Sequence, residues 1–332
     1  MMTKCERVQA VLQGRRPDRP PVSFWCHFPH EQVAGQAAIE AHLAHLSRFD
    51  LDFLKVMNDN GYPREGAAEV IRSVSDLKAL RVLRGMEGPF GVQLDVIRGL
   101  ARLLSGKVPL CTTVFNAWAT LRELVRAPRI EHGPPKLDGC DERDDVLTQW
   151  LKEDRTAVCE AIRVIGESLA NFAAECIAAG ADGIFLSVRD DWVDRPANGD
   201  GTYDELVRPA DLRIVEAAAA GTFNMLHVCG KAVNFEAFAR YPVHALNWAD
   251  RAAGPSIAYA RDRVKPAMCA GVDNLGVLCN GTSAQVADQV RDAIRQAQYR
   301  PILIAPGCTY DPATVPAENL RAMVEAARRS TG

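Results

Sequence analysis

Three residues in this chain combine the side-chain types and the spacing that a soft divalent metal requires. His227 and Cys229 lie two positions apart in FNMLHVCG (223–230), and a second thiol, Cys308, follows the apolar run PILIAPG (301–307). On an extended strand, residues two apart point to the same face. Two thiolates and one imidazole suit Zn²⁺, and three protein ligands leave a fourth position open, as in catalytic zinc sites. Spacing alone leaves an alternative open, in which the cysteines are ordinary buried residues and His227 is a hydrogen-bonded core histidine.

Further polar residues follow the apolar runs of the chain, and we expect them to contact a substrate. In each case the alternative is a solvated loop or simple packing. A lysine within one run, Lys55, points inward only if the strand register is right. The candidate substrate contacts are His27, Asn58, Asp59, Asn116, Asp190, Asn247, Asp273 and Tyr310.

The elements that position these residues are short apolar runs alternating with helical patterns, which is typical of a parallel sheet covered on both faces. Eight runs with helical crossovers predict an α/β protein, a single (β/α)8 TIM barrel over residues 1–332, in which the carboxyl ends of the strands meet at one mouth. The expected strands are Pro21–Phe28, Leu51–Met57, Val108–Phe115, Asp182–Val188, Phe223–Cys229, His244–Trp248, Pro266–Val272 and Pro301–Ala305.

Helices and insertions complete the expected layout. A helix over 3–14 precedes the first run, and an amphipathic helix over 282–298, with Gly281, Thr282 or Ser283 as its cap, precedes the last. The crossover at 61–107 has room for two helices, and the Pro-, Gly- and charge-rich stretch at about 127–145 predicts a surface excursion. A division into two domains near 130–150 is the alternative, but neither half has enough strands to close a barrel.

Composition excludes several classes of protein. The chain is 48% hydrophobic and 24% charged, with 39 basic and 42 acidic residues and a net charge of −3, so nothing indicates a nucleic-acid partner. No apolar run reaches the roughly 18 residues of a membrane span, and no signal peptide is evident. Ten cysteines in 332 residues are too few for a disulfide scaffold. We therefore expect a cytoplasmic protein with reduced thiols; the sequence leaves its oligomeric state open.

Four segments, spread over nearly the whole chain, carry a resemblance to a known family. They are ERVQAVLQGRRPDRPPV (6–22), ECIAAGADGIFLSVRD (175–190), LVRPADLRIVEAA (206–218) and HVCG (227–230). In order and spacing they resemble the uroporphyrinogen decarboxylase superfamily of barrels. That superfamily includes a metal-free porphyrinogen decarboxylase and zinc methyltransferases, which pass a methyl group from a corrinoid protein to a thiol such as coenzyme M.

The resemblance implies a zinc site, because the methyltransferases carry a His-x-Cys pair and a distant Cys as ligands, at positions that match His227, Cys229 and Cys308. The decarboxylases instead carry an arginine-rich loop after the first strand, which holds the carboxylates of the substrate. This chain has WCHFPHEQ (25–32) there, with no arginine between Arg19 and Arg48. A substrate with many carboxylates would lack its clamp.

The expected function is a zinc-dependent methyltransferase. The resemblance implies a methylated corrinoid (methylcobalamin) on a separate partner protein as the methyl donor and a small thiol as the acceptor. The alternatives are a decarboxylase or other lyase acting on a small carboxylated substrate, and a non-catalytic barrel that binds a ligand.

Overall fold

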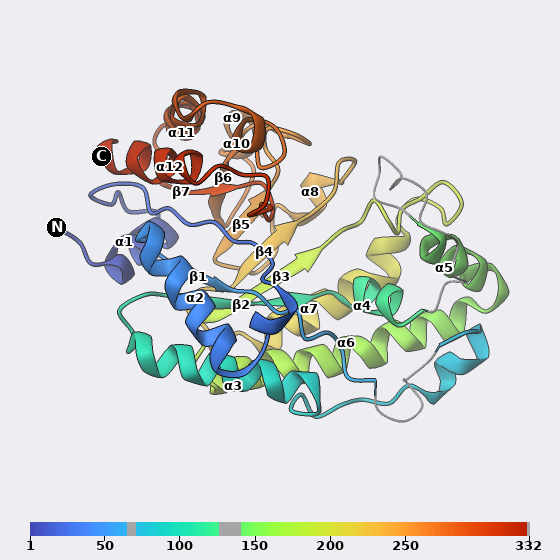
Figure 1. Cartoon of the computed structure of the whole chain (residues 1–332). Helices are drawn as coiled ribbons and strands as arrows, with labels where there is room; N and C mark the ends of the chain where they lie inside the picture. Colours follow the sequence, from blue (N-terminus) through green and yellow to red (C-terminus); the bar gives the residue numbers. More distant parts are fainter. Residues whose placement is uncertain (65–70, 126–140, 331–332) are drawn as a thin grey trace.

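The computed structural model describes residues 1–64, 71–125 and 141–330. Within these ranges, seven parallel strands lie side by side in chain order, from β1 (Leu54–Val56) to β7 (Ile302–Pro306), in one curled sheet. Helices connect the strands and cover the outer face of the sheet (Figure 1). The architecture is the α/β barrel type that the sequence predicts.

The other strands are β2 (Leu110–Phe115), β3 (Gly183–Val188), β4 (Met225–Val228), β5 (Ala245–Trp248) and β6 (Ala267–Val272). The longer helices are α1 (Lys4–Leu12), α2 (Gly35–Phe49), α3 (Pro89–Leu104), α4 (Ala117–Leu124), α5 (Glu142–Glu153), α6 (Arg155–Ala178), α7 (Arg208–Ala217), α11 (Ser283–Ala297) and α12 (Ala317–Arg329). Short helical turns are α8 (Phe235–Phe238), α9 (Ile257–Ala260), α10 (Val277–Asn280), His30–Gln32, Val74–Ala79 and Tyr203–Val207.

The strands separate an inner core from an outer one, because successive side chains point to opposite faces. Phe53, Phe185 and Met225 belong to the inner core, whereas neighbours on the same strands pack under the helices. Val8 and Val11 of α1 also join the inner core. Helix α1 therefore closes the amino-terminal end of the barrel, and the opposite end stays available for a site.

The first expected strand, Pro21–Phe28, is not a regular strand. Val22 makes an isolated parallel bridge with Ile304 of β7, and its carbonyl accepts the N–H of Asp52 at 2.9 Å. The N–H of Val22 donates to the Asp52 carboxylate (2.9 Å) and not to a backbone carbonyl of a neighbouring strand. Pro20 and Pro21 have no N–H to donate. The segment still closes the ring between β7 and β1.

A buried ion cluster holds this closure together. The carboxylate of Asp52 accepts hydrogen bonds from Arg7 of α1 (2.8 Å) and from Arg19 (2.6 and 3.0 Å). The side chains of Asp52 and Arg7 are 0% and 4% exposed. Since Asp52 also binds Val22, one carboxylate joins the helix at the base, the closing segment and the start of β1.

The helices differ from expectation mainly in extent. Helix α1 lies inside the range 3–14, and Thr3 caps it. Helix α11 begins after Thr282, which forms a capping box with Gln285. In the described part of 61–107, a 3₁₀ turn (Val74–Ala79) and α3 stand where two helices are expected. Most of the excursion at 127–145 lies outside the described residues, and its last residues begin α5.

In the described ranges, no helix combines the length and the apolar character that crossing a membrane requires.

We expect Asp52→Asn to lower the free energy of unfolding by about 3–5 kcal/mol, because Arg19, which is 14% exposed, loses its carboxylate partner and the buried Arg7 keeps only Asp18. Urea denaturation measures the loss. The matched control is Asp50→Asn, since Asp50 pairs with Lys4 on the surface and is 60% exposed; we expect this change to cost less than about 1 kcal/mol. Equal losses in the two variants would contradict the role given to Asp52.

Candidate metal centre

Strand β4 places His227 and Cys229 on the inner face of the barrel. Met225, two residues before His227, belongs to the inner core, and His227 is only 3% exposed. The N–H of Cys229 donates to the carbonyl of Val188 at 2.9 Å, which continues the β3–β4 pairing one residue past β4. The alternation therefore extends to Cys229, which lies half-buried at the mouth.

The loop after β7 brings Cys308 to the same place. The N–H of Gly307 donates to the carbonyl of Val272 (3.1 Å), and the side chain of Asn274 donates to the carbonyl of Thr309 (3.0 Å). A Cβ at position 307 would lie 2.6 Å from the Cα of Ala249, so only glycine allows this close approach. The loop turns toward β4 as a result.

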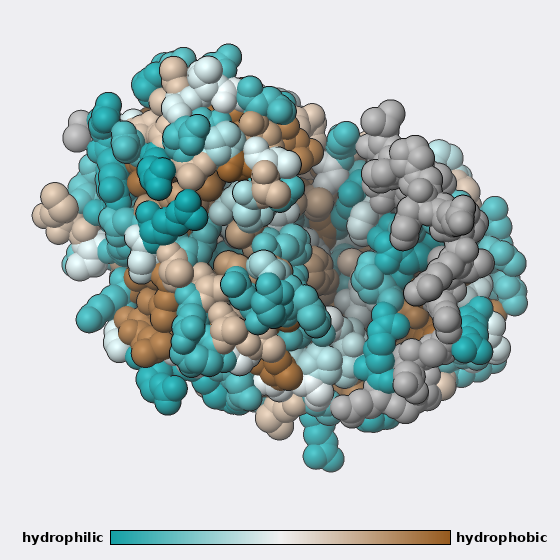
Figure 2. Space-filling model, viewed as in Figure 1, coloured by the Kyte–Doolittle hydropathy of each residue, from teal (hydrophilic) through white to brown (hydrophobic). Residues whose placement is uncertain are grey.

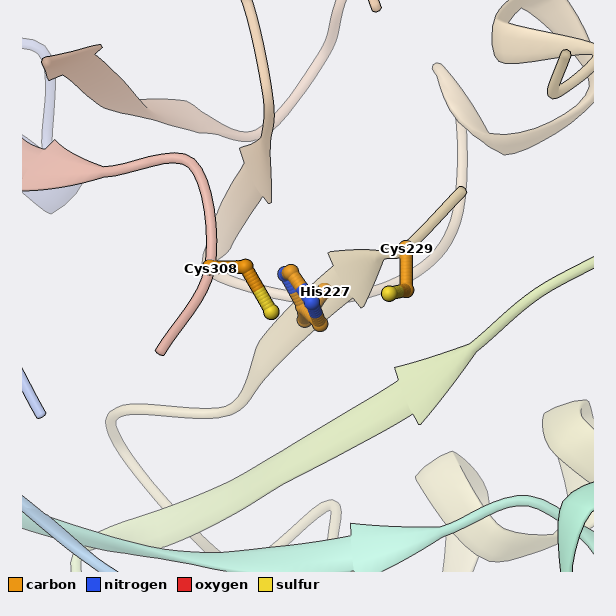
Figure 3. Close-up of side chains that lie close together, drawn as sticks. All are labelled: His227, Cys229 and Cys308. Atoms are coloured by element: carbon orange, nitrogen blue, oxygen red, sulfur yellow. The ribbon is translucent and has the colours of Figure 1, made fainter. Parts of the chain in front are cut away.

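The three predicted ligand atoms converge, because they all lie within 4.8 Å of one another. Figure 3 shows the sulfurs of Cys229 and Cys308 directed toward the imidazole of His227. Tetrahedral zinc with the usual bond lengths separates such atoms by about 3.5–3.8 Å, so small side-chain rotations suffice. The donor set fits zinc in type and in arrangement.

A hydrogen bond to Asn247 of β5 orients the imidazole of His227. The side-chain N–H groups of Asn247 donate to the carbonyls of Cys269 (2.7 Å) and Pro306 (3.1 Å). The Oδ1 of Asn247 therefore faces Nδ1 of His227 at 2.6 Å and can only accept, so Nδ1 carries the proton. Nε2 then holds a free lone pair; this buried atom has no hydrogen-bond partner among the described residues. A metal ligand requires this state of histidine.

The two thiols of the cluster are inequivalent. The interaction with the neighbouring Cys229 thiol holds the pKa of Cys308 well below its usual range. The same interaction, together with burial, raises the pKa of Cys229. The protein thus favours a thiolate at Cys308, and thiolates are the form in which cysteines bind metals.

The turn after Cys229 is fixed by Asp191. Its carboxylate accepts the N–H of Lys231 (3.1 Å) and pairs with Arg189. Gly230 has a φ of +116°, and a Cβ there would lie 2.6 Å from the Asp191 carboxylate. The glycine of the HVCG motif is therefore required by both the backbone conformation and the close carboxylate.

Lys55 lies inside the barrel below the mouth. Its ammonium is 4.7 Å from the centre of the Phe185 ring, and that ring stacks on His227 at 5.3 Å. Burial lowers the pKa of Lys55 to about 8, although the nearby Cys308 opposes the effect. The sulfur of Met57 is its hydrogen-bond partner (3.2 Å). The register therefore points Lys55 inward, close to the cluster of His227, Cys229 and Cys308.

A cavity of about 420 Å³ opens at the mouth beside the cluster, and three predicted substrate contacts line it: His27, Asn58 and Asp59. Nδ1 of His27 and Oδ1 of Asp59 are hydrogen-bonded at 2.6 Å. Figure 2 shows that the surface is hollowed where β3 and β4 end. The size is within the range of small-molecule sites.

Asn116 and Asp190 make hydrogen bonds to other parts of the protein. Asn116 caps α4 through the N–H of Ala119 (3.0 Å) and donates to the hydroxyl of Tyr203 (3.3 Å). Asp190 accepts the N–H of Asn234 (2.8 Å), and burial raises its pKa to about 6. Neither residue lines the cavity.

Asp273 and Tyr310 also lie apart from the cavity lining. The carboxylate of Asp273 accepts the N–H groups of Leu275 (3.1 Å) and Gly276 (3.0 Å), which shapes a turn. Tyr310 packs edge-on against Phe24, with ring centres 5.8 Å apart. Its backbone N–H helps to hold the Cys308 loop in place, through a bond to the carbonyl of Trp25 (3.1 Å).

Sequence reasoning missed the far wall of the cavity. Phe90 and Phe172 come from α3 and α6, and their rings stack at 4.3 Å. These two residues do not end strands, so a search of strand ends could not find them. Trp192, which follows β3, also lines the cavity. The alternation of Phe53, Lys55 and Met57 was a usable signal for Lys55, because the flanking residues are apolar.

Comparisons with known proteins agree with this architecture. A family model described as uroporphyrinogen decarboxylase (URO-D) matches residues 54–330. A methyltransferase from Methanosarcina mazei superposes with a TM-score of 0.76, at 16% identity, over 99% of both chains. At that identity the likeness concerns the fold, and it confirms the predicted barrel type.

Two further solved structures are less similar. A B12-independent methionine synthase from a Shewanella species gives a TM-score of 0.43 at 12% identity, over 72% of this chain and 67% of that one. A putative enzyme of the same description from Listeria monocytogenes gives 0.49 at 12% identity, over 72% and 70%. None of the curated proteins compared with the chain matches it.

We expect Asn247→Ala to weaken metal binding by about 10–100-fold, because the imidazole loses the acceptor that fixes its tautomer. Competition with a chromogenic chelator measures the affinity. The control is Asn319→Ala, since Asn319 is also buried but bonds to the carbonyls of Leu278 and Gly281. It should cost stability and leave metal affinity unchanged. Equal loss of affinity in both variants would show a merely structural effect.

We expect Lys55→Met to stabilise the fold at pH 7. Below pH 8 Lys55 is protonated in both states, and the folded state bears the whole cost of burying the charge. Between pH 8 and 10.5 the folded protein loses this proton while the unfolded chain keeps it, so this unfavourable contribution shrinks as pH rises. The lowering of the pKa from 10.5 to about 8 corresponds to about 3 kcal/mol.

Urea unfolding of the parent and of Lys55→Met at pH 7 and pH 10 tests this expectation. The stability difference should be largest at pH 7 and smaller at pH 10. Lys78→Met, on an exposed turn, is the control and should change stability little at either pH. A Lys55→Met variant that is less stable than the parent at pH 7 would contradict the expected cost.

Proposed function

Because the chain belongs to the uroporphyrinogen decarboxylase (URO-D) family, we propose that it is an enzyme of this family's methyltransferase type. It transfers a methyl group from a methylated corrinoid, carried by a partner protein, to a small thiol, and it depends on zinc. The observation that carries the proposal is the cluster of His227, Cys229 and Cys308, whose ligand atoms lie within 4.8 Å of one another.

His227, Cys229 and Cys308 would hold the metal. The free lone pair of His227 and the low pKa of Cys308 both favour ligation over a purely structural role. When bound, zinc would supply the Lewis acidity that keeps a thiol deprotonated at neutral pH. Three protein ligands leave one position for that thiol.

The reaction is a displacement at carbon. The acceptor thiol gives up its proton to bulk water, and its sulfur forms a bond to the methyl carbon. The methyl–cobalt bond breaks, and both of its electrons stay on cobalt. The chain's own residues position the sulfur: Asn247 orients His227, and Gly307 and Asn274 fix the loop of Cys308.

The charges at the mouth favour this chemistry over decarboxylation of a polycarboxylate. The segment 25–32 contains no arginine, and the acidic residues Asp59 and Glu123 line the cavity. Glu123 pairs with Arg143 and Asp59 with His27, and no Lys or Arg occurs among the described residues of the lining, so the carboxylates of a substrate would lack an arginine clamp there. The alternatives are a decarboxylase and a ligand-binding barrel. The two tests that follow, of zinc content and of methyl transfer, separate them from the proposed methyltransferase.

We expect purified protein to contain about one zinc per chain, and Cys229→Ser to lose it while remaining folded. Elemental analysis and circular dichroism measure the two properties. Cys159→Ser is the control, because Cys159 is exposed and lies on α6, away from the cluster. Folded parent protein that binds no zinc, or a Cys229→Ser variant that keeps it, would contradict the metal site.

Methyl transfer is tested by mixing the zinc-loaded protein with methylcobalamin and a panel of thiols and following cobalamin absorbance. We expect thiol-dependent demethylation by the parent and by Cys159→Ser but not by Cys229→Ser. If zinc binds and no thiol or candidate corrinoid protein supports demethylation, the metal site stands and the methyl-transfer proposal fails.

A further inference from the structure

The cavity at the mouth is the feature that the metal cluster alone does not explain. It has a volume of about 420 Å³, and none of the three cluster residues lines it. The corrinoid reaches the mouth on another protein in the proposed reaction. The enclosed space is therefore available to the other reactant, the thiol.

Two residues of the cavity lining, His27 and Trp192, are connected to the loops that carry the two cysteines. Two residues before His27, the carbonyl of Trp25 accepts the N–H of Tyr310 (3.1 Å), which is two residues after Cys308. The guanidinium of Arg189 lies 4.3 Å from the centre of the Trp192 ring.

Arg189 pairs with Asp191, and Asp191 in turn holds the N–H of Lys231, two residues after Cys229. The sheet register gives the separation: Phe115, which lines the cavity, is opposite Ser187 of β3, and Ser187 is opposite His227 of β4. The cavity therefore begins two strands, or about 10 Å, from the cluster.

The walls of the cavity are aromatic. Phe115, at the end of β2, is 39% exposed, although large apolar side chains on strands are usually covered. Phe90, Phe172 and Trp192 face the same space from other elements. Such a lining gains most from contact with a flat, apolar group, since apolar burial and ring stacking act together.

The charged side chains around the cavity are paired with one another. Asp59 and Glu123 are the carboxylates in the lining, and they pair with His27 (2.6 Å) and Arg143 (2.7 Å). Arg122 and Arg189 flank Trp192 and pair with Asp144 and Asp191. Since neither Lys nor Arg occurs among the described residues of the lining, an anionic ligand would lose its hydration there without gaining a cationic partner, whereas an uncharged ligand needs none.

We propose that this cavity binds the body of the acceptor thiol, and that this body is an uncharged aromatic or apolar group and not a short anionic chain. The identification of this ligand as the methyl acceptor rests on the proposed function. The binding of such a thiol can be measured without any methyl transfer, so the two can fail separately.

The test titrates zinc-loaded protein with phenylmethanethiol and with 2-mercaptoethanesulfonate in a calorimeter, without cobalamin. We expect the aromatic thiol to bind about tenfold more tightly or better. Ala119, on α4, lines the cavity; Ala119→Phe should fill it and weaken the aromatic thiol by at least about tenfold. Ala119→Ser is the control of similar size and should bind like the parent.

Two further variants keep the test decisive if Ala119→Phe does not fold. Phe115→Ala removes exposed aromatic surface and should weaken the aromatic thiol only. Glu123→Lys should shift the preference toward the anionic thiol, whereas the control Glu153→Lys, on exposed α5 surface, should not. Zinc content is measured in every variant, so that weaker thiol binding caused by loss of zinc is distinguished from weaker binding caused by a change in the cavity.

The outcomes separate the two proposals. Tight binding of the aromatic thiol that Ala119→Phe removes, without demethylation of methylcobalamin, would leave the cavity assignment standing and remove the methyl transfer. Equal or tighter binding of 2-mercaptoethanesulfonate by the parent would overturn the cavity assignment. Demethylation that is fastest with the anionic thiol and unchanged in Ala119→Phe would do the same.

Discussion

The hydrogen bond between His227 and Asn247 is the interaction on which the site depends. It joins β4 to β5, and the same carboxamide reaches β6 at the carbonyl of Cys269 and β7 at that of Pro306. The state of one imidazole nitrogen is therefore set by the register of four strands. A slip of one residue in any of them would turn these groups to the other face. The barrel thus fixes the direction of the lone pair on Nε2 of His227.

Local pattern predicted the parts of the site that depend on a single strand. Alternation places His227 and Cys229 on one face without knowledge of the fold, because side-chain direction repeats every two residues. Cys308 needed one further assumption, that parallel strands deliver their carboxyl ends to one mouth. The structure brings its sulfur within 4.8 Å of the other two ligand atoms. The role of Asn247 could not be predicted, since it requires the pairing of His227 with Asn247 across two strands.

Tertiary contacts determine the features that the sequence did not predict: the irregular first segment, the cavity wall and the contacts of the polar residues after strands. The run Pro21–Phe28 has the apolar character of a strand and bonds to Ile304 of β7 through Pro21 and Ser23, but Pro21 has no N–H to donate and the N–H of Val22 bonds to the Asp52 carboxylate, so no regular strand forms. The cavity depends on α3 and α6, which are remote in sequence from the strand ends and have no polar signal. Asn116 and Asp273 follow strands as expected, yet their side chains bind nearby backbone N–H groups. Short polar side chains after a strand often serve such turns, and sequence cannot separate this role from substrate binding.

Two buried charges, Asp52 and Lys55, differ in what they contribute to the stability of the barrel. Asp52 at the base is a buried charge with two arginine partners, so its partners offset the cost of burying it, and removing Asp52 alone is costly. Lys55 is a buried charge whose hydrogen-bond partner is a thioether, and the protein is less stable for keeping it. It lies near Cys308 and Asp59, between the cluster and the cavity. A cation at that point favours thiolate over thiol in its surroundings, because it lowers the energy of nearby negative charge. The buried charge that lowers the stability of the fold thus lies where the proposed reaction needs a thiolate.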